Sequence, residues 1–198
     1  MTSNHLMDAA QIARRAADMH APVIVIDGHC GSGKTTLARH LAALLQAPVI
    51  HMDDFFLPFA LRTPRRLSEA GGNVDYERFA AEVLPCIGGA ASFSYGRFSC
   101  SDGTMTPVLC PEAPVRIVEG TYSMHPRFMP CWQQLGALTV FCRVPPEEQL
   151  RRIEKRNPQL LERFRDEWIP MENRYFSAFR VAEQAAIEWT SFVEMSQK

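Results

Sequence analysis

The sequence predicts an α/β fold in which a mostly parallel sheet carries helices on both faces. Short apolar runs alternate along the chain with longer stretches whose apolar residues recur at helical spacing. Acidic residues stand at the ends of three of these runs, at Asp27, Asp53 and Glu119. Ligands of such sheets bind beyond the carboxyl ends of the strands, so we expect the functional site at this edge.

Composition limits the fold and the partners. The chain has 198 residues, 46% of them hydrophobic, and a formal net charge of −1. This length suits a single domain over residues 1–198. The charge balance gives no reason to expect nucleic acid or a membrane as partner, and no apolar run approaches the ~20 residues of a membrane span. The N-terminal stretch lacks an apolar signal core and the six cysteines show no zinc-ligand spacing, so we expect a cytoplasmic protein with reduced thiols.

The first half of the chain divides into elements at Gly and Pro. Residues 1–20 have the amphipathic pattern of a helix. The run VIVID at 23–27 predicts a buried parallel strand, and the leucine spacing over 35–46 predicts the helix that follows it. Residues 48–56 predict a second strand with a polar end. The Pro- and Gly-punctuated residues 57–72 predict a loop or lid-like insertion.

The second half begins with a helix predicted over 74–87, for which Asp75 is the expected start. Residues 92–110 alternate in polarity and turn at Asp102-Gly103, which predicts a hairpin. Further apolar runs predict strands, and two Arg-rich stretches predict helices. The expected strands are 113–122, 135–145 and 187–193, and the expected helices are 145–157 and 160–186.

The stretch GHCGSGKT, from Gly28 to Thr35, fits the pattern G-x-x-x-x-G-K-[ST] at every fixed position. Its glycines let backbone N–H groups face an anion at close range, and the following helix points its positive N-terminal end at the same place. Lys34 adds a charge for the β- and γ-phosphates, and Thr35 offers a hydroxyl to Mg²⁺. We therefore predict a nucleoside triphosphate site formed by Gly28, Cys30, Gly31, Ser32, Gly33, Lys34, Thr35 and Thr36.

This loop alone is compatible with a kinase, a GTPase or a mechanical ATPase. The chain has no NKxD-type tetrapeptide that would read guanine and no transporter-type ATPase signature. It is also small for a coupled machine. A kinase is therefore the favoured class.

Acidic and basic residues supply the remaining parts of such a kinase. Asp53 or Asp54 would take the proton of an acceptor hydroxyl, and Asp54 is the better candidate for capping the next turn. Glu119 stands where an acidic residue would hold Mg²⁺ directly or through water. The Arg-rich stretch that includes Arg152 and Arg156 is expected to supply at least one contact to the transferring phosphoryl group.

Taken in order, these motifs resemble one branch of the P-loop kinases. GSGKTT is followed by MDDFF, NVDYERF, SYGRFSCSDGT, APVRIVEG and LRRIEKRN. Over roughly residues 23–176 the chain resembles the uridine kinase branch of the P-loop nucleoside kinases, near phosphoribulokinase and the bacterial pantothenate kinases. The resemblance implies a three-layer α/β/α P-loop NTPase fold with a five-stranded, mostly parallel sheet. It also implies a hairpin insertion at about 90–110 and an Arg-rich lid at about 150–165.

The resemblance implies roles for individual residues as well. Asp53 matches the catalytic base and Glu119 the metal-associated acid, while Lys34 and Arg152 would act on the transferring group. Arg156 or Lys155 matches a second lid residue. The acceptor pocket would include Phe56, Asp75, Tyr95, Cys100 and Arg163, the last two standing where the family has a histidine and a glutamine.

These two departures leave the acceptor open. A thiol cannot make the hydrogen bonds of an imidazole, and an arginine suits an acceptor with a carboxylate or phosphate. We expect an ATP- and Mg²⁺-dependent kinase for a small-molecule hydroxyl, with a nucleoside as the default of the family. Alternative acceptors are a pantothenate-like acid, a sugar phosphate and a vitamin alcohol. A non-catalytic, ATP-sensing P-loop protein is the alternative without chemistry, and a homodimer is a further expectation.

Overall fold

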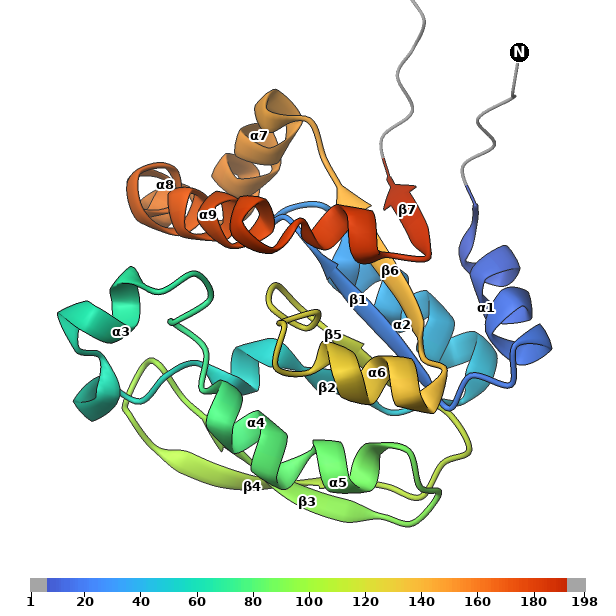
Figure 1. The fold of residues 1–198 in the computed structure, drawn as a ribbon. Helices are drawn as coiled ribbons and strands as arrows, with labels where there is room; N and C mark the ends of the chain where they lie inside the picture. The colour runs from blue at the N-terminus through green and yellow to red at the C-terminus, as the bar shows by residue number, and fades with distance from the viewer. Residues whose placement is uncertain (1–6, 192–198) are drawn as a thin grey trace, which may run out of the picture.

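The central sheet has five parallel strands in the order β2-β5-β1-β6-β7 (Figure 1). This is seen in a computed structural model of the chain, which describes residues 7–191. The strands are β1 Val23–Gly28, β2 Val49–His51, β5 Arg116–Glu119, β6 Leu138–Arg143 and β7 Ile187–Thr190. Every residue of β1 and β5 is buried, as expected for strands covered on both faces. The predicted α/β fold with a five-stranded parallel sheet is confirmed.

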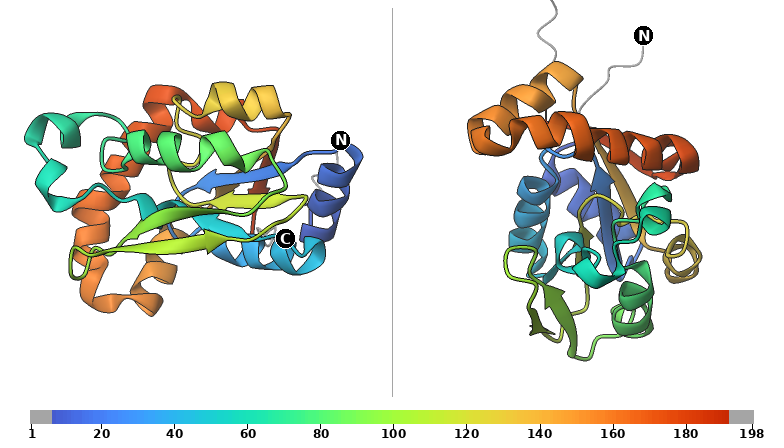
Figure 2. Two further views of the ribbon diagram at one scale, coloured as in Figure 1. Left: turned by 90° about the horizontal axis from the view of Figure 1, so that it is seen from below. Right: turned by 90° about the vertical axis from the view of Figure 1, so that its left-hand side faces the viewer.

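Helices form a layer on each face of the sheet (Figure 2). Successive residues of a strand point to opposite faces, so β1 contributes to two cores. Ile24 and Ile26 pack with α1 and α2, whereas Val23 and Val25 pack with α4, α5, α6 and α9. These helices are α1 Ala9–Asp18, α2 Lys34–Leu45, α4 Tyr76–Glu82, α5 Leu84–Ile87, α6 Met129–Leu135 and α9 Ile169–Phe179; a further helix, α7, spans Pro146–Arg156.

The region after β2 differs from the prediction in detail. β2 ends at His51, and the next four residues form a 3-10 turn, η1 Met52–Phe55. Asp53 and Asp54 therefore lie in a turn beyond the strand. The predicted loop over 57–72 contains two short helices, η2 Phe59–Leu61 and α3 Pro64–Ser68. Pro64 begins α3 without penalty, because the first helical N–H has no partner within the helix.

The predicted helix over 160–186 is divided in the structure. α8 Leu161–Arg163 continues into a π-helical turn, η4 Phe164–Trp168, which leads into α9. Pro170 lies in the first turn of α9, where a proline is tolerated. α9 ends because Arg180 adopts a left-handed conformation with φ 49°. Short 3-10 turns, η3 Pro158–Leu160 and η5 Val181–Gln184, flank this region.

The predicted hairpin is present as a separate two-stranded sheet. β3 Phe93–Phe98 pairs antiparallel with β4 Met105–Cys110. Its turn is closed by Asp102, whose carboxylate accepts a hydrogen bond from the Thr104 amide at 3.1 Å. The hairpin lies on the opposite side of the molecule from α7 and α9 (Figures 1 and 2).

The ends of the chain are described in part. Asp8 caps α1, and its carboxylate and the Gln11 side chain each accept a hydrogen bond from the other's amide. Residues 1–6 of the predicted first helix and 192–193 of the predicted last strand lie outside the described residues. Within residues 7–191, no helix combines the length and the apolar character that a membrane crossing needs. All six cysteines are free thiols.

Candidate active site

The glycine-rich loop joins β1 to α2 and has the geometry of an anion-binding nest. Gly28, Gly31 and Gly33 have φ values of 138°, 75° and 99°, which side-chain-bearing residues rarely adopt. Within residues 7–191, the amides of Gly31, Gly33, Lys34, Thr35 and Thr36 have no hydrogen-bond acceptor. The loop thus presents free N–H groups at the positive end of α2, which is the arrangement that binds phosphate.

Gly28 is required by the packing of the sheet. A Cβ atom at this position would lie 2.1 Å from the carbonyl oxygen of Cys142 in the neighbouring strand β6. Lys34 is buried, and its Nζ donates hydrogen bonds to the carbonyls of Gly28 and His29 at 2.8 and 2.9 Å. Its ammonium group is therefore held across the loop, where it adds a full positive charge to the nest.

Thr35 and Glu119, the two residues that the sequence analysis assigned to Mg²⁺, lie next to each other beside the loop. The Thr35 hydroxyl lies 3.3 Å from both carboxylate oxygens of Glu119. Within the described chain, no three acidic, histidine or cysteine side chains form a metal cage. Mg²⁺ usually binds through one or two protein ligands together with nucleotide phosphates and water, so this pair fits that ion.

His51 is an additional neighbour of Glu119. Its Nδ1 lies 2.6 Å from Oε1 of Glu119, because β2 and β5 pair with these two residues in register. The hydrogen bond that the His51 ring donates to the Glu119 carboxylate raises the pKa of His51. Sequence reasoning assigned this histidine no role, since an isolated His at a strand end carries no motif.

The two neighbouring aspartates of η1 have different environments. Asp54 is buried, and its carboxylate accepts hydrogen bonds from the Tyr95 hydroxyl at 3.0 Å and from Arg97 Nε at 2.8 Å. Asp53 is exposed, and its carboxylate has no hydrogen-bond donor or ion-pair partner in residues 7–191. It is close enough to Lys34 for electrostatic interaction. Asp53 is thus the carboxylate available to a bound molecule.

The environment of Asp53 favours its protonated form more than water does. The surrounding protein desolvates the carboxylate and raises its pKa. Lys34 opposes this shift, whereas Glu119 adds to it. A carboxylate with a raised pKa is a stronger proton acceptor, which suits a general base.

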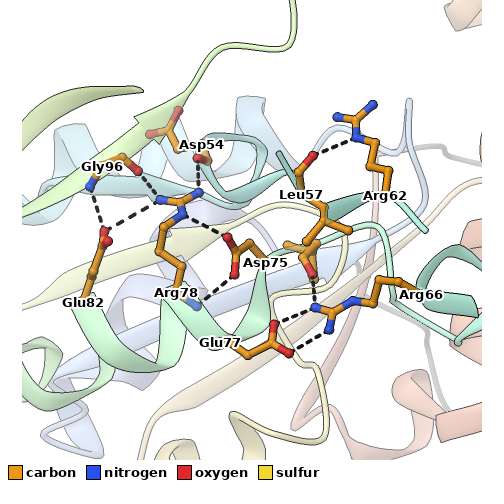
Figure 3. A network of polar contacts seen from close by, with 10 residues as sticks. Asp54, Leu57, Arg62, Arg66, Asp75, Glu77, Arg78, Glu82 and Gly96 are labelled. Atoms are coloured by element: carbon orange, nitrogen blue, oxygen red, sulfur yellow. Dashed lines mark hydrogen bonds and ion pairs between the residues drawn. The ribbon is translucent and has the colours of Figure 1, made fainter. Parts of the chain in front are cut away.

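Asp75 lies next to η1 but is held by its own helix. Its carboxylate caps α4 by accepting the Arg78 amide at 3.0 Å, and it also accepts from Arg78 Nε at 3.3 Å. Figure 3 shows that Arg78 reaches from α4 to the Asp54 carbonyl and to the Gly96 carbonyl of β3. A cavity of about 380 Å³ opens beside Asp75 and is lined by side chains of the 57–77 region.

The other predicted acceptor residues are spread over the molecule. Tyr95 is buried, with its ring stacked on Phe55 at 5.3 Å. Phe56 is half-buried and bridges to Val74 beside Asp75. Cys100 lies in the exposed hairpin turn, where its Sγ accepts from Arg62 at 3.4 Å. Arg163 is exposed on α8, paired with Glu167 at 3.2 Å.

The lid arginines differ in their contacts. Arg152 donates to the Gly31 carbonyl at 3.1 Å and to the Ser191 hydroxyl at 2.7 Å, and it pairs with Glu148. It therefore contacts the phosphate-binding loop at the Gly31 carbonyl. Arg156, one turn further along α7, is exposed and has no partner within residues 7–191.

Two buried acids beneath the loop were not singled out for a role by sequence reasoning. Asp27 is fully buried and accepts hydrogen bonds from the amides of Gly28, Tyr122 and Met124 and from the Tyr175 hydroxyl, at 2.7 to 3.1 Å. Glu172 of α9 accepts from the Cys30 amide at 2.9 Å. Asp27 was recognised as a strand-end acid, but a lone Glu in a helix gives no signal.

Comparison with known proteins supports the fold. No protein-family model and no curated protein sequence matches the chain. A structure from Bacillus stearothermophilus, described as a possible uridine kinase, has a TM-score of 0.63 at 18% identity and covers 90% of this chain and 96% of its own. The structure of a candidate fructose transport system kinase from Silicibacter sp. TM1040 has a TM-score of 0.65 at 22% identity, and the match covers 92% of this chain and 99% of that one. A structure from Saccharomyces cerevisiae, described as a candidate P-loop containing kinase with a circular permutation, has a TM-score of 0.65 at 13% identity and covers 87% of this chain and 95% of its own.

The fold of this chain is similar to that of P-loop kinase structures, and the glycine-rich loop lies between its first sheet strand and the following helix, as the motif predicts. More particularly, the fold is similar to that of the structure described as a possible uridine kinase, which confirms the resemblance predicted from the order of the motifs.

Proposed function

We propose that the protein is an ATP-dependent kinase that transfers the γ-phosphoryl group to a hydroxyl of a small molecule. The observation that carries the proposal is the position of Asp53 relative to the phosphate-binding loop. An accessible carboxylate without a partner lies within electrostatic reach of Lys34, at the loop whose amides are free to bind an anion. A protein that only binds nucleotide has no need of such a proton acceptor.

In this proposal the residues divide the work of phosphoryl transfer. The loop amides and Lys34 hold the phosphates, and Asp53 orients the acceptor hydroxyl and takes its proton. Mg²⁺, held by Thr35 and Glu119, would neutralise charge on the phosphate oxygens. Arg152 or Arg156 closes over the transferring group from the lid, where a guanidinium stabilises the charge that develops.

A nucleoside is the first candidate acceptor. The order of the motifs supports it, and one structural neighbour is described as a possible uridine kinase. In this case Asp75 would hold the sugar hydroxyls, and Phe56 would form part of the pocket.

One observation favours a second candidate, a sugar-like acceptor without a flat base. The ring of Tyr95, which would contact a base, is buried against Phe55, and its hydroxyl is bonded to Asp54. The cavity beside Asp75 is lined by Leu, Thr, Arg and carboxylate side chains and by no aromatic ring. Carboxylates and arginines are well suited to hydrogen-bond hydroxyl groups.

A panel of acceptors tests the proposal. ADP release from MgATP would be measured with nucleosides, sugars, sugar phosphates, pantothenate-like acids and vitamin alcohols. Stimulation by one class above the rate with water supports the kinase and identifies the acceptor. Tight ATP binding without stimulation by any acceptor would instead favour the non-catalytic ATP sensor.

A further inference from the structure

Glu172 connects α9 to the tip of the phosphate-binding loop. Its Oε2 accepts a hydrogen bond from the Cys30 amide at 2.9 Å. Its Oε1 lies 3.4 Å from the hydroxyl of Thr121, which also lies 3.0 Å from the Gly28 carbonyl. The side chain of Glu172 is buried, and 142 residues separate it from Cys30 along the chain.

Burial of the Glu172 carboxylate is energetically unfavourable, so the charge needs a contact that compensates for lost hydration. A buried carboxylate is unfavourable unless it is paired or hydrogen-bonded, and Glu172 has no ion-pair partner within residues 7–191. It also brings negative charge near a site for a polyanion. Burial raises the pKa of Glu172, while nearby Lys34 acts in the opposite direction.

The other side chains that reach the loop tip donate hydrogen bonds to carbonyl groups and, from Gln149, to the Cys30 thiol. Gln149 of α7 donates to the Cys30 carbonyl at 3.0 Å, and Arg152 donates to the Gly31 carbonyl at 3.1 Å. Glu172 is the side chain that holds an N–H group of the tip. The Cys30 amide is thereby kept on the side of α9, while the amides from Gly31 onward stay free for a ligand.

We propose that Glu172 is a positioning residue for phosphate binding, which keeps the loop tip in its receptive form by accepting the hydrogen bond of the Cys30 amide. The inference rests on the proposed function in one respect, namely that the loop binds nucleotide phosphates. Loss of the acceptor leaves the partly buried Cys30 amide without a partner and frees the tip to move.

Binding measurements on variants of Glu172 test this role. Dissociation constants of ATP, ADP and inorganic triphosphate would be measured by calorimetry for the wild type, Glu172→Leu and Glu172→Gln. Glu172→Leu should raise all three constants by about tenfold or more, because a hydrogen bond to a charged group is lost. Glu172→Gln keeps a carbonyl that can accept the Cys30 N–H, so its constants should stay within about threefold of the wild type or fall below them.

Two further variants serve as a control and as a second test. Glu183→Gln changes an exposed acid that pairs with Arg180 beyond the end of α9, and it should change none of the constants. Glu172→Asp keeps the charge but withdraws it from Cys30 by one methylene, so it should weaken binding by about threefold even if Glu172→Leu fails to fold.

The outcomes are distinct. The inference is overturned if the leucine variant, or the aspartate variant where leucine does not fold, binds all three ligands within twofold of the wild type. It is also overturned if the glutamine variant is as impaired as the leucine variant, because charge and not acceptance would then be responsible. A wild type that binds none of the three ligands would overturn the proposed function itself.

Discussion

The hydroxyl of Tyr95 donates a hydrogen bond to the carboxylate of Asp54 at 3.0 Å, and this contact separates the tasks of two adjacent aspartates. Arg97 binds the same carboxylate, so Asp54 fastens the hairpin to the turn after β2. The carboxylate of Asp53 is left without a donor in the described chain. A structural acid therefore holds the turn from which its neighbour can act on a ligand.

Replacement of Asp53 by Asn should abolish most phosphoryl transfer without weakening ATP binding. The amide is isosteric with the carboxylate but cannot take a proton, so kcat should fall by about 100- to 10,000-fold. The free energy of unfolding should not fall, because Asp53 has no partner to lose and the surrounding protein already disfavours its charged form. Turnover with the best acceptor of the panel and calorimetry with ATP measure the two effects.

Asp54→Asn is the matched control for this pair. It leaves Asp53 in place but removes the charge that binds Tyr95 and Arg97, so the free energy of unfolding should fall by about 1–3 kcal/mol. Urea unfolding would show this loss. The division of tasks is wrong if Asp53→Asn keeps near wild-type kcat, or if Asp54→Asn reduces kcat while leaving stability unchanged.

The dependence on Mg²⁺ should shift when Glu119 is neutralised. Glu119→Gln removes the charge next to Thr35 but keeps a side chain of the same size. The Mg²⁺ concentration that gives half-maximal turnover should rise by about 10- to 100-fold at saturating ATP. Glu188→Gln, which changes an exposed acid paired with Arg143, should leave the Mg²⁺ titration unchanged. Identical titrations for wild type and Glu119→Gln would remove Glu119 from the metal site.

Local patterns were sufficient to predict the sheet and the phosphate-binding loop. The loop could be predicted because Gly28, Gly33 and Lys34 are fixed by spacing and their function depends on the backbone between them. The hairpin and the start of α4 at Asp75 were likewise encoded within a few residues. The length of β2 was overestimated, because residues 52–55 form a 3-10 turn in which Tyr95 and Arg97 of the hairpin hold Asp54, and such contacts between distant residues leave no local pattern.

Contacts between distant segments could not be predicted in the same way. Asp27 was recognised as a strand-end acid, yet its bond to Tyr175 joins residues 148 positions apart. Glu172 reaches the loop only because α9 packs over it. The resemblance implied that Tyr95 contacts the acceptor. In the structure its ring is packed in the core, so a contact to an acceptor stays a prediction.

His125 should lower the stability of the fold in mildly acidic solution because it is buried as a neutral ring, whereas Asp53 and Glu172, whose pKa values are raised, act in the opposite direction. Its side chain stacks on Tyr76 at 4.8 Å, and burial, reinforced by Arg127 and Arg66, lowers its pKa to about 4. The unfolded chain takes up a proton near pH 6.5 and the folded chain does not. The contribution of His125 to the free energy of unfolding is therefore fully present above pH 6.5. As the pH falls toward 4, up to about 3 kcal/mol of it is lost.

Urea unfolding between pH 7.5 and pH 4 measures this effect. His29, whose pKa is also lowered to about 4 by burial, should contribute a second loss over the same range. His125→Phe keeps a flat ring without a titrating group. The free energy of unfolding of this variant should therefore depend less on pH than that of the wild type, by the contribution of one histidine. An equal decline in the two proteins would show that His125 does not titrate on unfolding.

Two glycines with positive φ allow a separation of steric packing from backbone strain. Gly28→Ala would place a Cβ atom 2.1 Å from the Cys142 carbonyl oxygen in a buried central strand, which cannot yield without opening the sheet. Gly136→Ala would meet no atom within 4 Å, so only the left-handed conformation at φ 65° is unfavourable. Gly28→Ala should therefore lower the free energy of unfolding by more than about 4 kcal/mol, and Gly136→Ala by about 1–2 kcal/mol. Urea unfolding followed by circular dichroism compares them, and equal losses would mean that β6 does not approach β1 as closely as the structure has it.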